Sequence, residues 1–371
     1  MRVLLTGGGT GGHVNPALAI ADIIKSKRPD AEIAFIGTKR GIENRLVGKE
    51  GYKIYHVGAA GFNRKVPFSP KNVAAAWYYV TSPIKAKRII KEFKPDIVIG
   101  TGGYVCYAPL KAASELGVPT MVHESNAYPG LAVKMLQKSI DKILLNFAEG
   151  EKYITEKDKI AVVGNPIRNA FENYDKKEAR RALGIGDDKK YVVLSYGGSL
   201  GAPCINEAAL EIMQKIDKNR PEILHIHATG KRHFAEFSKR FAELGLDKCK
   251  NIEMSEYIYD MPVKLAAADL VISRAGAMTV TEMARMKKPC IMIPSAHVAE
   301  NHQYKNAKVL EDDGAVVLIK ENEDTSKNVC AAVENLLADD KKRDEMSKNI
   351  AKFAKNNVSE LIWTEIEKLL K

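Results

Sequence analysis

A histidine that directly follows a run of glycines combines an anion-binding turn with a proton-transfer group near the start of the chain. The first fifteen residues read MRVLLTGGGTGGHVN. Apolar residues 3–5 predict a buried strand, and the apolar periodicity of residues 17–24 predicts a helix. Glycines let the backbone approach a phosphate closely, and a helix N-terminus favours negative charge. We therefore expect residues 7–12 to hold a phosphate group, with His13 beside it as an acid or base.

The same glycines match the dinucleotide-binding pattern G-x-G-x-x-G. A nicotinamide-binding fold has an acidic residue at the end of its second strand, where it holds the ribose hydroxyls. Here the second predicted strand, residues 33–36, ends in Gly37 and Thr38, and Glu32 stands at its beginning. The pattern therefore favours a ligand-binding turn of another kind, and a nicotinamide-dependent oxidoreductase is only a remote alternative.

Two further glycine-rich turns follow predicted strands. Residues 100–103 follow the predicted strand 96–99, and residues 197–201 follow the predicted strand 191–195. Three such turns are many for one phosphate group, and they would suit a diphosphate on each of two substrates. For any single turn, glycines that only pack at a strand end remain an alternative.

Polar residues follow other predicted strands, where parallel sheets bind their ligands. The sequence HESNAYPG at residues 123–130 follows the predicted strand 120–122, although an asparagine there also suits a turn. Residues 276–279 predict a helix N-terminus that is ready for a phosphate. Glu282, one turn further on, would accept hydrogen bonds from sugar hydroxyls. A capping box with Thr279 explains it equally well.

A metal site is not expected from the sequence. His225 and His227 point to the same face of a predicted strand, but no third ligand is spaced nearby, which favours histidines packed in a core. There is no Asp-x-Asp motif, and the five cysteines are scattered without a C-x-x-C pair.

Strands and helices alternate along the whole chain, which predicts parallel sheets covered by helices. With 371 residues, 45% of them hydrophobic, the chain can form two cores. The alternation pauses near residues 164–166 and then restarts. We therefore expect an α/β fold of two doubly wound domains facing a central cleft, residues 1–164 and 165–354. A C-terminal helix near 355–371 can pack back on the first domain. The expected strands are residues 3–5, 33–36, 53–57, 96–99, 120–122, 142–145, 160–162, 191–195, 223–226, 252–254, 270–272, 290–293 and 315–318.

The formal net charge of +11 favours phosphorylated ligands, anionic lipid or nucleic acid. No motif interleaves basic and aromatic residues for nucleic-acid recognition, so no nucleic-acid partner is expected. No apolar run approaches the length of a membrane span, and residues 1–2 lead directly into a strand. Neither a signal peptide nor a membrane anchor is therefore expected.

Residues 62–93 raise the question of membrane contact. In the helix predicted over residues 72–93, Val73, Trp77, Val80 and Ile84 form one stripe, which is most simply explained as core. An anionic membrane surface would meet apolar and aromatic side chains that lie among lysines and arginines, namely Phe62, Val66, Phe68, Tyr78 and Tyr79. Core packing with a solvated charged face explains the segment about as well.

An ordered set of motifs spans the chain. They are GGGTGGHV at 7–14, GGYV at 102–105, HExNAxPG at 123–130, GNPxR at 164–168, GGSxGA at 197–202, SRxGA at 273–277 and HQxxNA at 302–307. This set resembles the MurG family of N-acetylglucosaminyltransferases. The resemblance implies the GT-B architecture and a peripheral enzyme at the cytoplasmic face of the bacterial cell membrane. It also implies that N-acetylglucosamine (GlcNAc) moves from UDP-GlcNAc to the C4 hydroxyl of MurNAc in undecaprenyl-diphosphoryl-MurNAc-pentapeptide, without a metal or other cofactor. Another UDP-sugar-dependent GT-B transferase with a lipid acceptor is the alternative.

The resemblance also implies roles for single residues. The donor would be bound by Thr10, Gly11, Gly12, Asn126, Arg168, Ser199, Ile258, Ala277, Met278, Thr279, Glu282 and Gln303. In this set Ile258 would meet the uracil through its backbone, Glu282 the ribose hydroxyls, and Ser199 the diphosphate. The acceptor side would comprise His13, Asn15, Gly102, Gly103, Tyr104 and Glu124, with His13 as general base or as a diphosphate contact. The pair Cys106-Tyr107 stands where the family usually has small residues.

Overall fold

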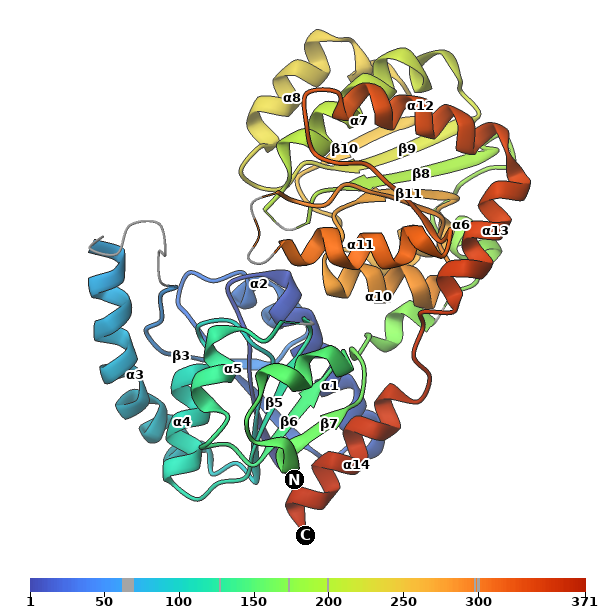
Figure 1. Ribbon diagram of the computed structural model, residues 1–371. Helices are drawn as coiled ribbons and strands as arrows, with labels where there is room; N and C mark the ends of the chain where they lie inside the picture. Colours follow the sequence, from blue (N-terminus) through green and yellow to red (C-terminus); the bar gives the residue numbers. More distant parts are fainter. Residues whose placement is uncertain (62–69, 127, 173, 199, 297, 299–300) are drawn as a thin grey trace. The chain divides into compact units, whose positions relative to one another are not determined.

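The computed structural model describes residues 1–61, 70–126, 128–172, 174–198, 200–296, 298 and 301–371. The chain forms two compact units (Figure 1). The first comprises Met1–Arg168 and Lys355–Lys371, and the second comprises Asn169–Ala354. Each unit is built on one parallel sheet.

The sheet of the first unit has the strand order β3-β2-β1-β4-β5-β6-β7. Its strands are β1 (Arg2–Thr6), β2 (Glu32–Gly37), β3 (Lys53–His56), β4 (Ile97–Gly100), β5 (Thr120–Glu124), β6 (Lys142–Leu145) and β7 (Ile160–Val162). The order reverses between β1 and β4, which pair in parallel with Thr6 opposite Gly100. In a doubly wound sheet, ligands bind beyond the carboxyl ends of the strands at this reversal.

The sheet of the second unit repeats the arrangement, with the order β10-β9-β8-β11-β12-β13. Its strands are β8 (Tyr191–Tyr196), β9 (Ile223–Ala228), β10 (Ile252–Ser255), β11 (Leu270–Ser273), β12 (Cys290–Met292) and β13 (Val316–Leu318). Here the reversal lies between β8 and β11, where Tyr196 stands opposite Ser273. All thirteen predicted strands are present, with ends within two residues of the prediction.

Helices lie between most of the strands, and the last three follow the final strand β13. They are α1 (Gly11–Lys27), α2 (Glu43–Lys49), α3 (Pro70–Phe93), α4 (Tyr107–Glu115), α5 (Leu131–Leu136), α6 (Lys176–Ala182), α7 (Pro203–Lys215), α8 (Phe234–Glu243), α9 (Met261–Ala267), α10 (Ala277–Met286), α11 (His302–Asp312), α12 (Thr325–Ala338), α13 (Asp340–Ala351) and α14 (Val358–Leu370). Short 3-10 turns are η1 (Ala148–Tyr153), η2 (Lys157–Lys159), η3 (Asn169–Glu172), η4 (Asp217–Asn219) and η5 (Leu246–Lys248).

The last helix, α14, belongs to the first unit. It packs beside α1, with Ile362 and Ile366 fully buried. Its polar side pairs Glu360 with Lys27 at 2.6 Å. The sequence predicts continuous helix over residues 344–371, but the helix is interrupted between α13 and α14. The interruption ends at Asn357, which has a left-handed backbone with φ of 59° and so cannot continue a right-handed helix.

Helix α3 contradicts the expectation that its large apolar stripe is core. Val73, Trp77, Val80 and Ile84 are between 59% and 69% exposed. The buried positions in the earlier turns of the helix carry small residues, Ala75, Ser82 and Ala86, whereas its last turns bury Ile89, Ile90 and Phe93. Ser82 donates a hydrogen bond to the Gly58 carbonyl at 2.6 Å. Helix α3 packs against α4, and the apolar residues of its exposed stripe face away from the core. Within the described residues, no helix is long and apolar enough to cross a membrane.

The two strand histidines of the second unit are core residues. His225 and His227 are at most 1% exposed, and both ring systems bond the Ser195 hydroxyl, at 2.8 and 2.7 Å. His225 also pairs with buried Asp217 at 2.5 Å. The chain of hydrogen bonds joins β8 and β9 inside the sheet, as the core interpretation predicts.

Buried histidines make the stability of the fold sensitive to acid. His123 on β5 is fully buried, and burial lowers its pKa from 6.5 to about 4. Between pH 6.5 and about 4, His123 is protonated in the unfolded chain but not in the folded protein. We therefore expect the free energy of unfolding to fall as the pH drops through this window, by about 1.4 kcal/mol per pH unit for this residue.

The variant His123→Gln isolates this contribution. The glutamine amide can donate to the Gly164 carbonyl, as the His123 Nε2 does at 2.9 Å, but it does not titrate. Urea unfolding of both proteins at several pH values should give a shallower pH dependence for the variant. Equal slopes would show that His123 is protonated in the folded protein as readily as in the unfolded chain.

Candidate active site

Two glycine turns meet at the strand reversal of the first unit, one after β1 and one after β4. Gly103 has φ of +78°, and a Cβ there would lie 2.5 Å from the Gly8 carbonyl oxygen. Gly102 has φ of +94°, and a Cβ there would lie 2.7 Å from the His13 Nδ1. Only glycine satisfies both the backbone angle and the space at these positions. The turns therefore pack backbone against backbone, with the His13 ring beside them.

His13 is held in one tautomer by the turn after β4. Its Nδ1 lies 3.2 Å from the Thr101 carbonyl oxygen, which only accepts, so Nδ1 carries the proton and Nε2 keeps its lone pair. The buried Thr101 hydroxyl donates to the His13 carbonyl at 2.6 Å. Burial lowers the pKa of the imidazole below 6.5, and the nearby Glu124 carboxylate opposes that effect. His13 is therefore neutral near pH 7, with a nitrogen able to accept a proton.

Glu43, which the sequence analysis missed, fixes the shape of the first glycine turn. It is 1% exposed at the start of α2. Its carboxylate accepts hydrogen bonds from the Gly9 N–H at 3.2 Å and from the Thr38 N–H and hydroxyl, both at 2.8 Å. An acidic residue does follow β2, and its carboxylate already accepts hydrogen bonds from Gly9 and Thr38.

Glu124, at the end of β5, holds the next turn in a similar way. Its carboxylate accepts from the Asn126 N–H at 2.9 Å, from the Asn126 side chain at 3.0 Å and from the Gly130 N–H at 2.8 Å. Glu124 is 3% exposed. The carboxylate thus holds Asn126 and Gly130 while remaining within electrostatic reach of His13.

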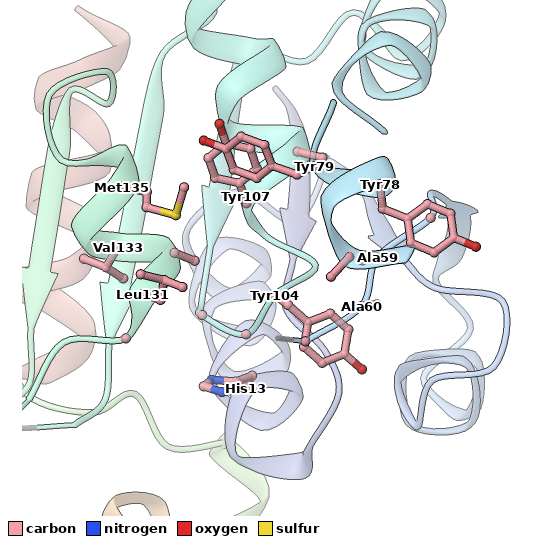
Figure 2. A pocket seen from close by; sticks show the side chains of 18 of the residues that line it. His13, Ala59, Ala60, Tyr78, Tyr79, Tyr104, Tyr107, Leu131, Val133 and Met135 are labelled. Atoms are coloured by element: carbon pink, nitrogen blue, oxygen red, sulfur yellow. The ribbon is translucent and has the colours of Figure 1, made fainter. Parts of the chain in front are cut away.

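A pocket of about 290 Å³ opens beside these turns (Figure 2). Five residues predicted for the acceptor side line it, together with the donor candidate Asn126: His13, Gly102, Gly103, Tyr104, Glu124 and Asn126. Tyr78 and Tyr79 of α3 also line the pocket and are 37% and 36% exposed, so they are not the outermost residues of that helix. Membrane contact by Tyr78 and Tyr79 stays a prediction, and the more exposed apolar side chains of α3 are Val73, Trp77, Val80 and Ile84.

Of the other predicted residues of the first unit, Thr10, Gly11, Gly12 and Asn15 lie at the start of α1, and Arg168 is the last residue of the segment Met1–Arg168. Thr10 is the exposed N-cap of α1, followed by Gly11 and Gly12, and Asn15 is half-buried in the next turn. Arg168, expected to contact the donor, forms ion pairs with Asp22 at 3.2 Å and Glu50 at 2.8 Å. These two carboxylates raise the pKa of the Arg168 guanidinium, while burial acts against them.

The second unit presents the N-terminus of α10 at its own strand reversal. Gly276 is the N-cap, so Thr279 lies inside the helix and the capping box with Glu282 does not form. The preceding loop is braced by Arg274, which pairs with Glu321 at 2.8 and 3.2 Å. The first-turn N–H groups of a helix lack intrahelical acceptors and suit an anion.

Helix α11 braces the same region through the HQxxNA motif. The Asn306 side chain donates to the Ala275 carbonyl at 3.2 Å, next to the start of α10. The Gln303 side chain accepts from the Ser295 N–H at 2.9 Å. The motif therefore has a structural role in positioning the loops before α10 and after β12.

Glu282 is the buried acid of the second unit, 8% exposed on α10. Desolvation raises its pKa to about 8. Ile258, Ala277 and Met278 are also buried, and Thr279 is half-buried. Ser199 lies outside the described residues, as do Phe62, Val66 and Phe68. In the described part of the chain, no group of three or more His, Cys, Asp or Glu side chains is placed to hold a metal ion.

The two Rossmann-like units, each built on a parallel sheet, have the architecture of the GT-B class of glycosyltransferases. Residues 3–145 match the glycosyltransferase family 28 N-terminal domain, and residues 192–362 match the C-terminal domain of that family. The chain belongs to the MurG family of N-acetylglucosamine transferases.

Full-length relatives support this membership. Two of them carry the name UDP-N-acetylglucosamine–N-acetylmuramyl-(pentapeptide) pyrophosphoryl-undecaprenol N-acetylglucosamine transferase. The one from Acetivibrio thermocellus is 42% identical over 100% of this chain and 99% of its own length. The one from Alkaliphilus metalliredigens is 39% identical over 100% of both chains. The crystal structure of Acinetobacter baumannii MurG is similar with a TM-score of 0.69, at 27% identity and 99% coverage of both chains.

The role of Glu43 can be tested by the substitution Glu43→Gln. The glutamine side chain has the size of glutamate, but its NH2 group donates hydrogen bonds and cannot accept them. At least one of the three groups that donate to Glu43, on Gly9 and Thr38, would therefore lose its acceptor. We expect a loss of about 1–3 kcal/mol in unfolding free energy, measured by urea denaturation. The exposed pair residue Glu115 is the control, and Glu115→Gln should change stability by less than about 1 kcal/mol. Equal effects of the two substitutions would contradict the role of Glu43.

Proposed function

We propose that this protein transfers GlcNAc from UDP-GlcNAc to the C4 hydroxyl of the muramyl sugar in undecaprenyl-diphosphoryl-MurNAc-pentapeptide. The observation that carries the proposal is the 42% identity, over the whole chain, with a relative whose name states this reaction. The chemistry of the described residues is compatible with it. The first unit offers a neutral histidine beside two glycine turns, and the second offers a braced helix N-terminus with a buried carboxyl group.

In this proposal the second unit binds most of UDP. The N-terminus of α10 stabilises the diphosphate, Glu282 accepts from the ribose hydroxyls and the backbone of Ile258 meets the uracil. Ser199 and Gln303 are further donor contacts, as are Thr10, Gly11, Gly12, Asn126 and Arg168 of the first unit. The braces from Arg274 and Asn306 support the α10 assignment, because a fixed helix start needs no rearrangement when an anion binds.

The reaction itself needs a base and a stabilised leaving group. The C4 oxygen of the acceptor attacks C1 of GlcNAc, the bond from C1 to the β-phosphate oxygen breaks, and UDP leaves with the electron pair. His13 Nε2 takes the hydroxyl proton, and the Glu124 carboxylate stabilises the imidazolium that forms. Backbone N–H groups and the α10 dipole stabilise the charge that develops on the diphosphate.

The direct test is the transfer of labelled GlcNAc from UDP-GlcNAc to a soluble analogue of the lipid-linked acceptor, with and without a chelator. We expect product in both reactions, because in this proposal the α10 dipole and backbone N–H groups, and not a metal cation, stabilise the negative charge on the leaving diphosphate. Thermal stabilisation of the folded protein by UDP, but not by NADH or an oligonucleotide, would separate this activity from the alternatives. A folded protein that neither binds UDP nor transfers the label would refute the proposal.

The base role predicts a specific kinetic defect. His13→Gln should lower kcat by about 10²- to 10⁴-fold, since general-base catalysis is lost, and leave KM for UDP-GlcNAc nearly unchanged. Steady-state kinetics with both substrates varied measures this, and UDP-induced thermal stabilisation of the variant confirms that the donor site is intact. An unchanged kcat would remove His13 from the chemistry and leave it as a diphosphate contact.

The donor role of Glu282 predicts that UDP affinity depends on pH. In the free protein its pKa is about 8, so the group is protonated at neutral pH, whereas ribose hydroxyls bind best to the ionised form. Binding should therefore release a proton, and affinity should rise with pH up to about 8, by at most about tenfold per pH unit.

Isothermal titration calorimetry in buffers of different ionisation enthalpy measures the proton release directly. Glu282→Gln is the matched control, because it removes the titration while the phosphates of UDP titrate as before. The variant should bind UDP more weakly and with a smaller pH dependence. The same proton release in both proteins would assign the effect to the ligand and contradict the donor role.

We also propose a peripheral position at the cytoplasmic face of the cell membrane, in contact with anionic lipid. The support comes from α3, whose exposed Trp77, Val80 and Ile84 are followed by exposed Lys85 and Arg88. Apolar side chains ringed by cations suit the surface of an anionic bilayer.

The membrane proposal predicts that Trp77→Ala weakens binding to vesicles containing anionic phospholipid by about tenfold or more, since a large aromatic surface no longer enters the lipid. Co-sedimentation with vesicles measures the change. Leu361→Ala, on the exposed side of α14, is the control for a general loss of apolar surface. Wild-type binding by the Trp77 variant would place the membrane contact elsewhere.

A further inference from the structure

The pocket of the first unit is polar at one end and apolar over most of its walls. His13 and the turn at Gly102 and Gly103 form the polar end. The walls come from α3, α4 and α5 and include Tyr79, Tyr107, Leu131 and Met135, as Figure 2 shows. A cavity with this polarity matches a ligand that carries an anionic group on a hydrocarbon chain.

Several apolar wall residues are unusually exposed. Leu131 is 46% exposed and Met135 is 41% exposed, although both stand on a short helix that otherwise packs into the core. Apolar side chains that gather around a cavity and remain uncovered are typical of a binding surface. Tyr79 lies over Tyr107 with ring centroids 4.3 Å apart and planes 18° apart, so the pair forms a flat aromatic wall.

We infer that this pocket holds the isoprene units of the acceptor that are nearest to its diphosphate. The inference rests on the proposed function, which supplies a polyprenyl diphosphate. The first isoprene carbon is bonded to a phosphate oxygen, so a diphosphate at the turn of Gly102 and Gly103 would bring the first isoprene units to the apolar walls of the pocket. The volume of about 290 Å³ lies at the lower end of the range for small-molecule pockets, which suits a short hydrocarbon segment and not a whole polyprenyl chain.

The wall formed by α3 gives the rest of the chain a continuous apolar path. Tyr78 and Tyr79 face the pocket, whereas Trp77 and Val80, their neighbours in sequence, are 67% and 68% exposed on the outside. A polyprenyl chain leaving the pocket therefore meets the same helix that we propose to contact the membrane.

The test uses two water-soluble acceptors, both muramyl-pentapeptide diphosphates, which differ only in the ester on the diphosphate: methyl or geranyl. Without membranes or detergent, any preference reports the pocket. For the wild type we expect kcat/KM to be about tenfold or more higher for the geranyl acceptor, because burial of a few methylene groups has an effect of that size. Tyr107→Ala and Leu131→Asn should each remove most of this preference while leaving the methyl acceptor within about twofold of wild type.

Trp77→Ala is the matched control, because it changes an apolar residue of α3 outside the pocket and should keep the full geranyl preference. If the wild type shows no preference, or if both pocket variants lose activity equally with the two acceptors, the pocket does not hold the isoprene units. A muramyl-sugar site would give the second of these results. Absence of transfer to both acceptors by the folded wild-type protein would instead refute the proposed function.

Discussion

The close approach of two backbone turns at one strand reversal sets the geometry of the first unit. The Gly8 carbonyl and the Gly103 Cα lie so close that no side chain fits between them. Thr101, just before that contact, bonds His13 through both its carbonyl and its hydroxyl. If the turns separated, His13 would lose its fixed tautomer and the pocket would lose its polar end. Proton acceptance and the diphosphate-binding proposal therefore depend on the same contact.

Much of this arrangement follows from the sequence. The positions of the strands are predictable because each is a short run of apolar residues between turn-forming residues, and order along the chain fixes which carboxyl ends meet. His13, Gly102, Gly103 and Glu124 line one pocket because they lie at or just after the carboxyl ends of the neighbouring strands β1, β4 and β5. Their positions relative to the predicted strands already indicate this. The family membership, read from ordered motifs, is confirmed by relatives that match over the full chain.

Other features depend on contacts that local patterns do not encode. Glu43 bonds Gly9 across 34 positions and Thr101 bonds His13 across 88, so neither partner is apparent from spacing. The prediction that the large apolar stripe of α3 is core is wrong, because hydrophobic periodicity identifies a stripe of large residues without showing which face of the helix packs against the rest of the protein. The buried face of α3 combines Ala75 and Ala86 with Ile89, Ile90 and Phe93, and its first turns leave Trp77 and Val80 exposed. Periodicity therefore locates such a helix but does not orient it.

The proposed site also has to reconcile buried carboxylates with phosphate ligands. Unpaired acids near a diphosphate would repel it strongly at low dielectric. Glu43 and Glu124 avoid this conflict because each carboxylate already accepts hydrogen bonds from two backbone N–H groups and one side-chain donor, which offset its charge. Glu282 uses another solution, since a pKa of about 8 keeps it neutral until a ligand with hydroxyl donors binds. Acidic residues can thus shape an anion site in this proposal, provided that backbone N–H groups, or the hydroxyl groups of the bound ligand, offset their charge while the phosphate is bound.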